Sequence, residues 1–550
     1  PQLEKYNLGI LCQELGIPLE QAHSALSDAQ ATAELFLCMR QKMFGLPKGL
    51  LERLLSLSDS LLYESYLVIE EVYQKQSLLV EHDLVEVQGL FLRKEKPVLS
   101  PRKLSKDFQT NIALLGLEER SQQEEFAQKV QEFLQGEAIS FIQAQTGIGK
   151  TYGYLLPALS LENEEGILLS VPTKILQNQV IQEEAKRLEE IFHISIHSLK
   201  GPQNYLKLDA FHTALEEEES NRLYTRFKMQ LLVWLTETDT GDLDEIGQLY
   251  RYQQFLPNLV HDGNLHKDSL FWLEDFWKRG QDKARSCKLL VTNHAYLVTR
   301  LEDDPSLLEG RLLILDEAQK VLLTLENLSR KSYLLTDLLD QLDQALLREE
   351  GMLQRRLLES IRFEVSYLLD QFLSGKRKMC PASSIDKLRQ DFSELNLLEF
   401  KDYQRFFTSE GEFWLSTSDV SSKKVEITSS RNHRLLFSQI FPESCQLLGI
   451  SATLEISSRV SLPELLGFPQ TAFYCIDEQF QENQEILLVK DFPLVTEISS
   501  EEYAQAIVEI LEELFQLEEP ILVLFTAKDL LLQVSDALRI PHLAQYKHGE

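Results

Sequence analysis

The sequence lacks the marks of several common protein classes. No run approaches the ~20 apolar residues that a membrane-spanning helix needs, so we expect no membrane partner. The six cysteines are scattered and none forms a Cys-x-x-Cys pair. We therefore expect reduced thiols, a cytoplasmic location, and neither a disulfide framework nor a zinc site. Positive charge is scarce, with a formal net charge of −31. This disfavours a polyanionic partner, although one local basic groove on an acidic protein would suffice.

The length of 550 residues allows several packed cores, since domains usually have ~100–200 residues. The chain begins at Pro1 and ends at Glu550 in what reads as the middle of a domain, so we expect a fragment of a longer protein. The predicted organisation is a helical segment at 1–45, a connector at 46–105, an α/β domain at 106–480 with mainly helical inserts at 207–284 and 321–437, and the beginning of a second α/β domain at 481–550.

Short apolar runs alternate with helical patterns from about residue 106, which predicts a doubly wound α/β fold with parallel sheets. The expected strands of the first domain are Ala138–Gln143, Ile167–Val171, Leu289–Val291 and Leu312–Leu315, with a helix at Tyr152–Leu159. The second domain is expected to begin with a strand at Glu485–Val489, a helix at Ala504–Phe515 and a strand at Ile521–Phe525.

A phosphate-binding loop is the strongest signal. It lies between a predicted strand and a predicted helix and reads Ala144-Gln145-Thr146-Gly147-Ile148-Gly149-Lys150-Thr151. Glycines let backbone N–H groups turn toward phosphate, the lysine neutralises the outer phosphates, and the threonine hydroxyl can ligate Mg²⁺. The strict pattern has glycine where this chain has Ala144, a small residue. We therefore predict that ATP binds here with Mg²⁺.

A carboxylate pair follows a later apolar strand, in the run Asp316-Glu317-Ala318-Gln319. Phosphate chemistry needs one carboxylate to hold the metal and another to orient water. We assign the first role to Asp316 and the second to Glu317. Such a pair usually marks only the end of a strand, but after a phosphate-binding loop in the same chain it favours an ATP hydrolase.

With these two motifs in order, residues 105–550 resemble superfamily-two helicases of the DinG/XPD group, which implies RecA-like motor domains. The resemblance implies that Arg120 and Gln123 read adenine and that Gln319 senses the γ-phosphate. It also implies that Ser451, Ala452 and Thr453 couple hydrolysis to domain movement. Four further candidates for contact with DNA, or for coupling, are Thr173, Lys174, Asn293 and His294.

The chain departs from this group at its iron–sulfur domain. Many members have a cysteine where this chain has Lys207, and only Cys287 lies near the positions of the four expected thiolates. We therefore predict no iron–sulfur cluster, with the 207–284 insert in its place. The family's last two motifs, which contain an arginine finger, are not in the chain, so the fragment is expected to be catalytically incomplete.

The N-terminal segment resembles the C-terminal part of DnaQ-type (DEDDh) exonucleases, a ribonuclease H-like fold. His23-Ser24-Ala25-Leu26-Ser27-Asp28 fits the pattern H-x-A-x-x-D. The resemblance implies that His23 is the general base and that Asp28 helps to hold a pair of divalent metal ions. The other metal-binding carboxylates would lie upstream of Pro1.

These patterns leave alternative functions open. The first is an ATP-dependent helicase or translocase on single-stranded or tailed DNA, coupled to a 3′–5′ exonuclease. The second is a 3′–5′ exonuclease that ATP regulates without unwinding, which the missing cluster cysteines favour. The third is a binding module on an inactive ATPase fold, which the intact Lys150, Thr151, Asp316 and Glu317 disfavour.

Overall fold

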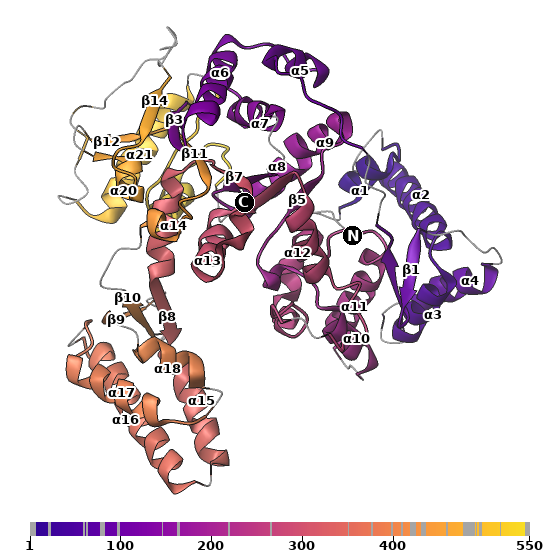
Figure 1. Cartoon of the computed structure of the whole chain (residues 1–550). Coiled ribbons are helices and arrows are strands. Elements are labelled where there is room, and N and C mark those ends of the chain that lie inside the picture. The colour runs from indigo at the N-terminus through magenta and orange to yellow at the C-terminus, as the bar shows by residue number, and fades with distance from the viewer. Residues whose placement is uncertain are drawn as a thin grey trace. The chain divides into compact units, whose positions relative to one another are not determined.

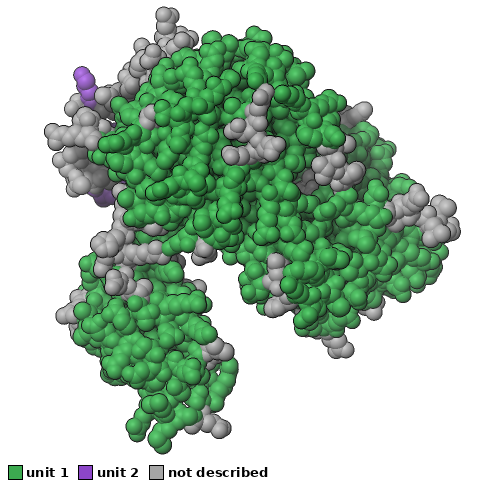
Figure 2. Space-filling model, in the orientation of Figure 1, with its two compact units in different colours: residues 1–476 green, residues 477–550 purple. Residues whose placement is uncertain are grey.

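The computed structural model describes residues 7–544, apart from 20–23, 59–60, 62–63, 77–82, 96–99, 146, 162–165, 218–220, 265–266, 350, 376–377, 398–399, 409–410, 418–424, 431–435, 458–459, 477–489, 491, 494–497 and 517–518. The chain divides into two compact units, residues 1–476 and 477–550, which Figure 2 colours separately. None of the helices in the described ranges has the length and apolar character needed to cross a membrane.

A seven-stranded parallel sheet is the centre of the first unit (Figure 1). The strand order is β14-β3-β11-β7-β4-β6-β5, and every neighbouring pair is parallel. This arrangement confirms the predicted α/β class. The strands are β3 (Ile139–Gln143), β4 (Gly166–Val171), β5 (Ile196–Ser198), β6 (Leu289–Asn293), β7 (Arg311–Leu315), β11 (Gln446–Ser451) and β14 (Ala472–Cys475). The four strands predicted for this domain are β3, β4, β6 and β7.

Helices cover both faces of the sheet, and its central strands are accordingly buried at nearly every position. Along β7, Leu312 and Ile314 face one core cluster whereas Leu313 and Leu315 face the other. The first cluster includes residues of α5 (Phe108–Leu114), α6 (Ser121–Gly136), α7 (Lys150–Ser160), α8 (Lys174–Val180) and α9 (Lys186–Phe192). The second includes residues of α12 (Phe276–Ser286), α13 (His294–Asp303), α14 (Gln319–Ser329), α19 (Phe437–Ile440) and α20 (Leu462–Leu466).

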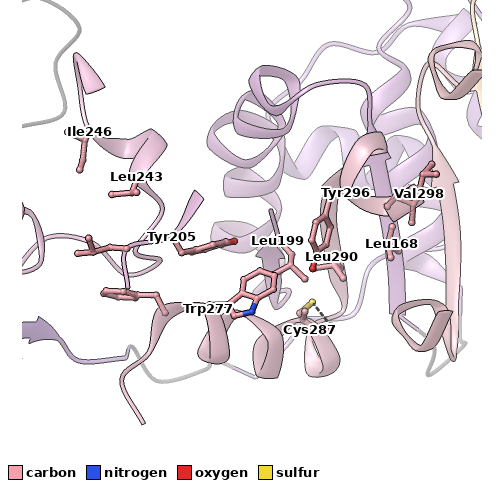
Figure 3. Close-up of a cluster of buried hydrophobic side chains, with 14 of the residues drawn as sticks. Leu168, Leu199, Tyr205, Leu243, Ile246, Trp277, Cys287, Leu290, Tyr296 and Val298 are labelled. Carbon is pink, nitrogen blue, oxygen red and sulfur yellow. Dashed lines mark hydrogen bonds between the residues drawn. The ribbon is translucent and has the colours of Figure 1, made fainter. Parts of the chain in front are cut away.

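The insert expected at 207–284 is mainly helical, with α10 (Leu208–Glu216), α11 (Arg222–Trp234) and 3₁₀ turns at Leu243–Glu245 and Leu249–Asn258. Its aromatic side chains join the sheet's own core. Trp277 lies against Tyr205 and Tyr296, with ring centroids 5.5 and 6.4 Å away (Figure 3). Phe276 and Trp277 are buried and therefore pack in this core.

The insert expected at 321–437 contains α15 (Leu335–Arg348), α16 (Met352–Leu373), α17 (Ala382–Glu394) and α18 (Lys401–Thr408), which pack on one another (Figure 1). It also contains a three-stranded antiparallel sheet that the sequence pattern did not predict, in the order β8-β10-β9. These strands are β8 (Arg330–Leu334), β9 (Glu412–Thr417) and β10 (Val425–Ser430). The insert therefore enters and leaves through neighbouring strands.

The segment expected as a connector, 46–105, is folded. It contains α3 (Lys48–Leu57), α4 (Tyr66–Lys75) and a hairpin of β1 (Leu84–Val87) and β2 (Leu90–Arg93). Leu50, Leu54, Leu90 and Leu92 belong to the same core cluster as the 207–284 insert. Before it lie α1 (Leu8–Leu15) and α2 (Ala25–Phe44).

The second unit contains α21 (Ser500–Phe515) and α22 (Lys528–Ala537), and α21 confirms the predicted helix. The strand predicted at Ile521–Phe525 is wrong, because these residues form no ladder and Leu522 and Leu524 are exposed. A strand needs a neighbour for its N–H and C=O groups, and no strand lies in the described part of this unit. The strand predicted at Glu485–Val489 lies outside the described residues.

Close packing within the central sheet gives a test of the fold. Gly449 of β11 faces the Phe141 ring so closely that a Cβ atom would overlap it. Gly449→Ala should therefore destabilise the protein by about 1–3 kcal/mol, measured as a lower thermal unfolding midpoint. Gly136→Ala, at the end of α6 where nothing lies within 4 Å, should be neutral or slightly stabilising. Equal midpoints for the two variants would contradict this packing.

Candidate functional site

The motifs found in the sequence meet at one edge of the central sheet. The phosphate-binding loop follows β3, the carboxylate pair follows β7, and Ser451 ends β11. These three strands are neighbours and parallel, so their carboxyl ends lie together. Backbone bonds join the segments beyond them: Ala144 N–H donates to Ser451 O at 3.0 Å, and Ala318 N–H donates to Ile450 O at 2.8 Å.

The loop before α7 depends on glycine. Gly147 and Gly149 have φ of +89° and +84°, in the left-handed region that L side chains avoid. A Cβ atom on Gly149 would also overlap the buried side chain of Gln123. Arg120 donates from Nη1 to Gly147 O at 3.3 Å, and Gln123 donates from Nε2 to Gly149 O at 2.8 Å. The two residues expected to read adenine thus hold the loop backbone in this structure.

The remaining loop residues vary in exposure. Ala144 is buried, Gln145 is exposed and Ile148 is half-buried. Thr146 lies outside the described residues.

A chain of polar contacts connects the three motifs. Lys150 Nζ forms an ion pair with Glu317 Oε1 at 2.6 Å. Gln319 donates from Nε2 to Glu317 Oε2 at 2.6 Å, and its Oε1 accepts the hydroxyl of Ser451 at 2.7 Å. The Thr453 N–H in turn donates to Ser451 Oγ at 3.0 Å. Lys150, Glu317, Gln319 and Ser451 are therefore linked side chain to side chain, and the backbone of Thr453 extends this path.

The two carboxylates have opposite protonation behaviour. Burial acts to raise the pKa of Glu317, but hydrogen bonds from Lys150 and Gln319 hold that pKa below its ordinary value. Burial raises the pKa of Asp316 to about 6, against the attraction of the Lys150 charge. Glu317 is thus an anion paired with Lys150, whereas the half-buried Asp316 binds a proton more readily than an ordinary carboxyl.

Asp316 has the surroundings of a Mg²⁺ ligand. Its Oδ2 accepts a hydrogen bond from the buried Tyr154 hydroxyl at 3.3 Å, and its Oδ1 accepts the Glu317 N–H at 3.0 Å. Thr151 lies one turn before Tyr154 on α7, and its hydroxyl interacts with that of Tyr154. Carboxylate and hydroxyl oxygens are the donors that Mg²⁺ prefers, so Asp316 and Thr151 fit this ion. The described residues contain no group of three or more His, Cys, Asp or Glu side chains that could hold a metal by themselves.

Of the four residues expected to contact DNA or to couple, two are exposed. Thr173 and Lys174 begin α8, where the Thr173 hydroxyl accepts the Leu176 N–H at 3.2 Å. Lys174 Nζ donates to Asn204 Oδ1 at 2.5 Å and lies 3.9 Å from Asp244 of the first insert. These two side chains are available to a phosphate backbone.

Asn293 and His294 lie at the carboxyl end of β6 and are 7% and 0% exposed. Asn293 donates from Nδ2 to Oε1 of the buried Gln177 at 2.9 Å. His294 Nδ1 lies 2.7 Å from the hydroxyl of Ser170, a residue of β4. Side chains this deeply buried do not reach a nucleic acid, which corrects the expectation of DNA contact. Coupling, the other role expected for the pair, suits the geometry.

The N-terminal nuclease candidates are only partly described. His23 lies outside the described residues. Asp28 lies in the first turn of α2, beside an open hollow of about 740 Å³ lined also by Ala29, Thr32, Ala33, Phe36 and Leu37. Asp28 and its neighbours are far in sequence from the sheet edge where the ATP motifs meet.

Two buried site residues, Tyr154 and Ser170, have no sequence motif of their own. Tyr154 lies four residues after Lys150 on α7, so helical spacing predicts that both face the same side. Ser170 gives no such signal, because its partner His294 is distant in sequence and only the sheet brings them together.

Comparison with known proteins supports the sequence pattern. Residues 121–234 match the family model described as DEAD/DEAH box helicase. The "3'-5' exonuclease DinG" of Staphylococcus saprophyticus is 31% identical over 340 residues, covering 58% of this chain and 36% of the relative. The protein of the same name from Staphylococcus aureus strain USA300 is 27% identical over 426 residues, covering 74% and 45%.

The chain therefore spans less than half the length of these two relatives. A solved structure titled XPD helicase aligns over 77% of this chain and 75% of its own, at 14% identity and a TM-score of 0.44. Over part of its length the chain is thus similar to the DEAD/DEAH box helicase model and to two proteins named DinG.

The pKa of Asp316 gives a test of the metal site. Lowering the pH below about 6 protonates this carboxyl, so protons should compete with Mg²⁺ for it. Affinity for a Mg²⁺–nucleotide complex should fall by up to about tenfold per pH unit below that value and be flat above ~7. A fluorescent ATP analogue titrated between pH 5 and 8 measures this. The Asp316→Asn protein reports any pH dependence of the nucleotide itself, and identical profiles for the two proteins would refute the assignment.

Proposed function

We propose that this chain is the ATP-hydrolysing part of a helicase that moves along single-stranded or tailed DNA, and that the intact protein couples this motor to a 3′–5′ exonuclease. The observation that carries the proposal is the polar chain Lys150–Glu317–Gln319–Ser451. It joins a phosphate-binding loop, a carboxylate pair and a coupling segment at the edge of one parallel sheet.

The ion pair between Lys150 and Glu317 gives the site two arrangements. In this structure the lysine that would bind the outer phosphates is held by the carboxylate that would activate water. A nucleotide phosphate competes for Lys150, and Glu317 then becomes free to orient a water molecule for attack. Mg²⁺, held by Asp316 and Thr151, would neutralise charge that develops on the phosphates.

Gln319 provides a path from hydrolysis to movement. Its amide donates to Glu317 and accepts from Ser451. When Glu317 moves away from Lys150, the Gln319 amide either moves with the carboxylate or loses its hydrogen bond to it. Either change alters the hydrogen bond between Gln319 and Ser451. The proposal is that the segment Ser451-Ala452-Thr453 transmits this change. Gln319 thereby acts at a position where histidine is commoner in the group.

The exonuclease half of the proposal rests on the pattern His23 to Asp28 and on the name of the relatives, which are called 3′–5′ exonucleases. His23 would serve as general base and Asp28 would hold part of a two-metal site, with the other carboxylates supplied by residues that precede this sequence. We propose a cytoplasmic location for the whole protein, consistent with six free cysteines in the described residues.

A second candidate is a 3′–5′ exonuclease that ATP regulates without unwinding. Lys207 favours it. This residue stands where the group's first cluster cysteine is expected, and its Nζ forms an ion pair with Asp262 of the insert at 2.9 Å. An insert fastened by an ion pair and an aromatic core takes the place of the cluster domain on which unwinding by many members depends.

Lys150→Ala should abolish ATP hydrolysis, because it removes the charge that binds the outer phosphates. The assay uses the intact protein with Mg²⁺ and a labelled tailed DNA duplex, with and without ATP. A native gel reports strand separation and a denaturing gel reports shortening. Lys129→Ala, a change on the surface of α6 where Lys129 pairs with Glu132, is the matched control and should leave both activities unchanged.

ATP-dependent separation of intact strands, lost in Lys150→Ala, supports the motor. Shortening without separation, lost in His23→Ala or Asp28→Ala, supports the regulated exonuclease instead. Intact protein that hydrolyses no ATP with saturating single-stranded DNA would refute the motor.

Lys174→Ala should weaken binding of single-stranded DNA while leaving ATP binding unchanged, because Lys174 is exposed at the start of α8. Loss of one phosphate contact should reduce the slope of log affinity against log salt by about 0.7. Fluorescence anisotropy with a labelled oligonucleotide at several salt concentrations measures both quantities. Lys401→Ala, an exposed lysine of the second insert, is the control. An unchanged slope in Lys174→Ala would remove this residue from the DNA interface.

A further inference from the structure

The turn that carries the catalytic carboxylates has a strained backbone. Glu317 has φ of +48°, one of few non-glycine residues with positive φ in the described ranges. Such a conformation persists only where the surroundings impose it. The N–H groups of the turn are all held: Asp316 donates to Ser170 O at 2.9 Å, Glu317 to Asp316 Oδ1, and Ala318 to Ile450 O. The bonds from Asp316 and Ala318 fix the turn to β4 and β11, the two strands beside β7.

His294 lies against the same turn with one nitrogen unused. Its Nδ1 is 2.7 Å from the hydroxyl of Ser170, the residue whose carbonyl accepts the Asp316 N–H. The imidazole is fully buried, and Nε2 finds no hydrogen-bond partner among the described residues. The Ser170 hydroxyl can donate to Nδ1, and the tautomer that accepts it carries the ring proton on Nε2, beside the backbone of Asp316 and Glu317.

The position of His294 is fixed from the side of α8. Asn293 directly before it donates to Gln177, and its Oδ1 accepts the Tyr296 N–H at 3.0 Å. Gln177 is itself fully buried, and its amide donates to Leu199 O and Val291 O, each at 3.1 Å. Gln177 lies one turn after the exposed Thr173. A continuous polar path thus leads from the start of α8 to the carboxylate turn.

We propose that His294 is a positioning residue for ATP hydrolysis: supported by Ser170 and anchored through Asn293 to Gln177, it directs its Nε2 proton toward the backbone of the Asp316–Glu317 turn. This contact holds the strained turn while Glu317 orients water. His294 touches neither nucleotide nor the attacking water. This inference rests on the proposed ATPase function, and it gives the unused nitrogen a role that burial alone does not explain.

The test compares His294→Phe, which keeps a ring but removes both nitrogens, with His294→Gln, whose amide restores a donor. ATP hydrolysis by the intact protein is measured with saturating single-stranded DNA, and nucleotide affinity with a fluorescent ATP analogue. We expect kcat to fall at least tenfold in His294→Phe, with KM and nucleotide affinity within twofold of the wild type. His294→Gln should recover part of kcat. Ser170→Ala is a milder change, and its kcat should lie between those of the two His294 variants.

Hydrogen–deuterium exchange provides a readout that does not need activity. The peptide covering residues 313–320 should exchange faster in His294→Phe, while peptides of β3 and β11 should not change. His197→Phe is the matched control, because His197 is another histidine of this sheet, half-buried, with an Nε2 that has no hydrogen-bond partner among the described residues. It should leave kcat and exchange at 313–320 unchanged.

Two results would overturn the proposal. One is a parallel loss of kcat and nucleotide affinity in His294→Phe with faster exchange across the whole sheet, which would make the residue merely structural. The other is unchanged exchange at 313–320. If the wild-type protein hydrolyses no ATP, the proposed function fails, and the exchange comparison still decides whether His294 holds the turn.

Discussion

The ion pair between Lys150 and Glu317 is the interaction on which the site depends. It forms because β3 and β7 both neighbour β11 in a parallel sheet, so that residues far apart in sequence leave the sheet at the same edge. Hydrogen bonds from Lys150 and Gln319 hold the pKa of Glu317 below its ordinary value in spite of its burial, whereas burial raises the pKa of Asp316 beside it. One site therefore holds two carboxyl groups whose pKa values are shifted in opposite directions.

Much of this arrangement could be predicted from the sequence. The strands β3, β4, β6 and β7 are apolar at nearly every position, which is the mark of a parallel sheet covered on both faces. The phosphate-binding loop is a local pattern, because its glycines, Lys150 and Thr151 are consecutive or nearly so. Features that depend on residues close together in sequence, such as this loop, could therefore be predicted from the sequence.

The rest depended on partners that sequence does not reveal. The pairs β8 with β10 and His294 with Ser170 join residues about a hundred positions apart, and nothing local marks either of them. Asn293 and His294 form a recognisable motif, but their burial follows from the sheet and from Gln177. The opposite error occurred at Ile521–Phe525, where an apolar run typical of a strand has no neighbouring strand in the described residues with which to pair.

The entry and exit of the second insert have a consequence for how such a protein can change over time. Arg330 at the start of β8 pairs directly with Ser430 at the end of β10, and paired residues of antiparallel strands are only ~5 Å apart. The two ends of the insert therefore lie as close together as the two ends of an ordinary hairpin. Because closing a loop costs little more as the loop lengthens, this site could accept, enlarge or lose a whole module without disturbing the ATP-binding edge. The central α/β domain and this insert can accordingly evolve at independent rates.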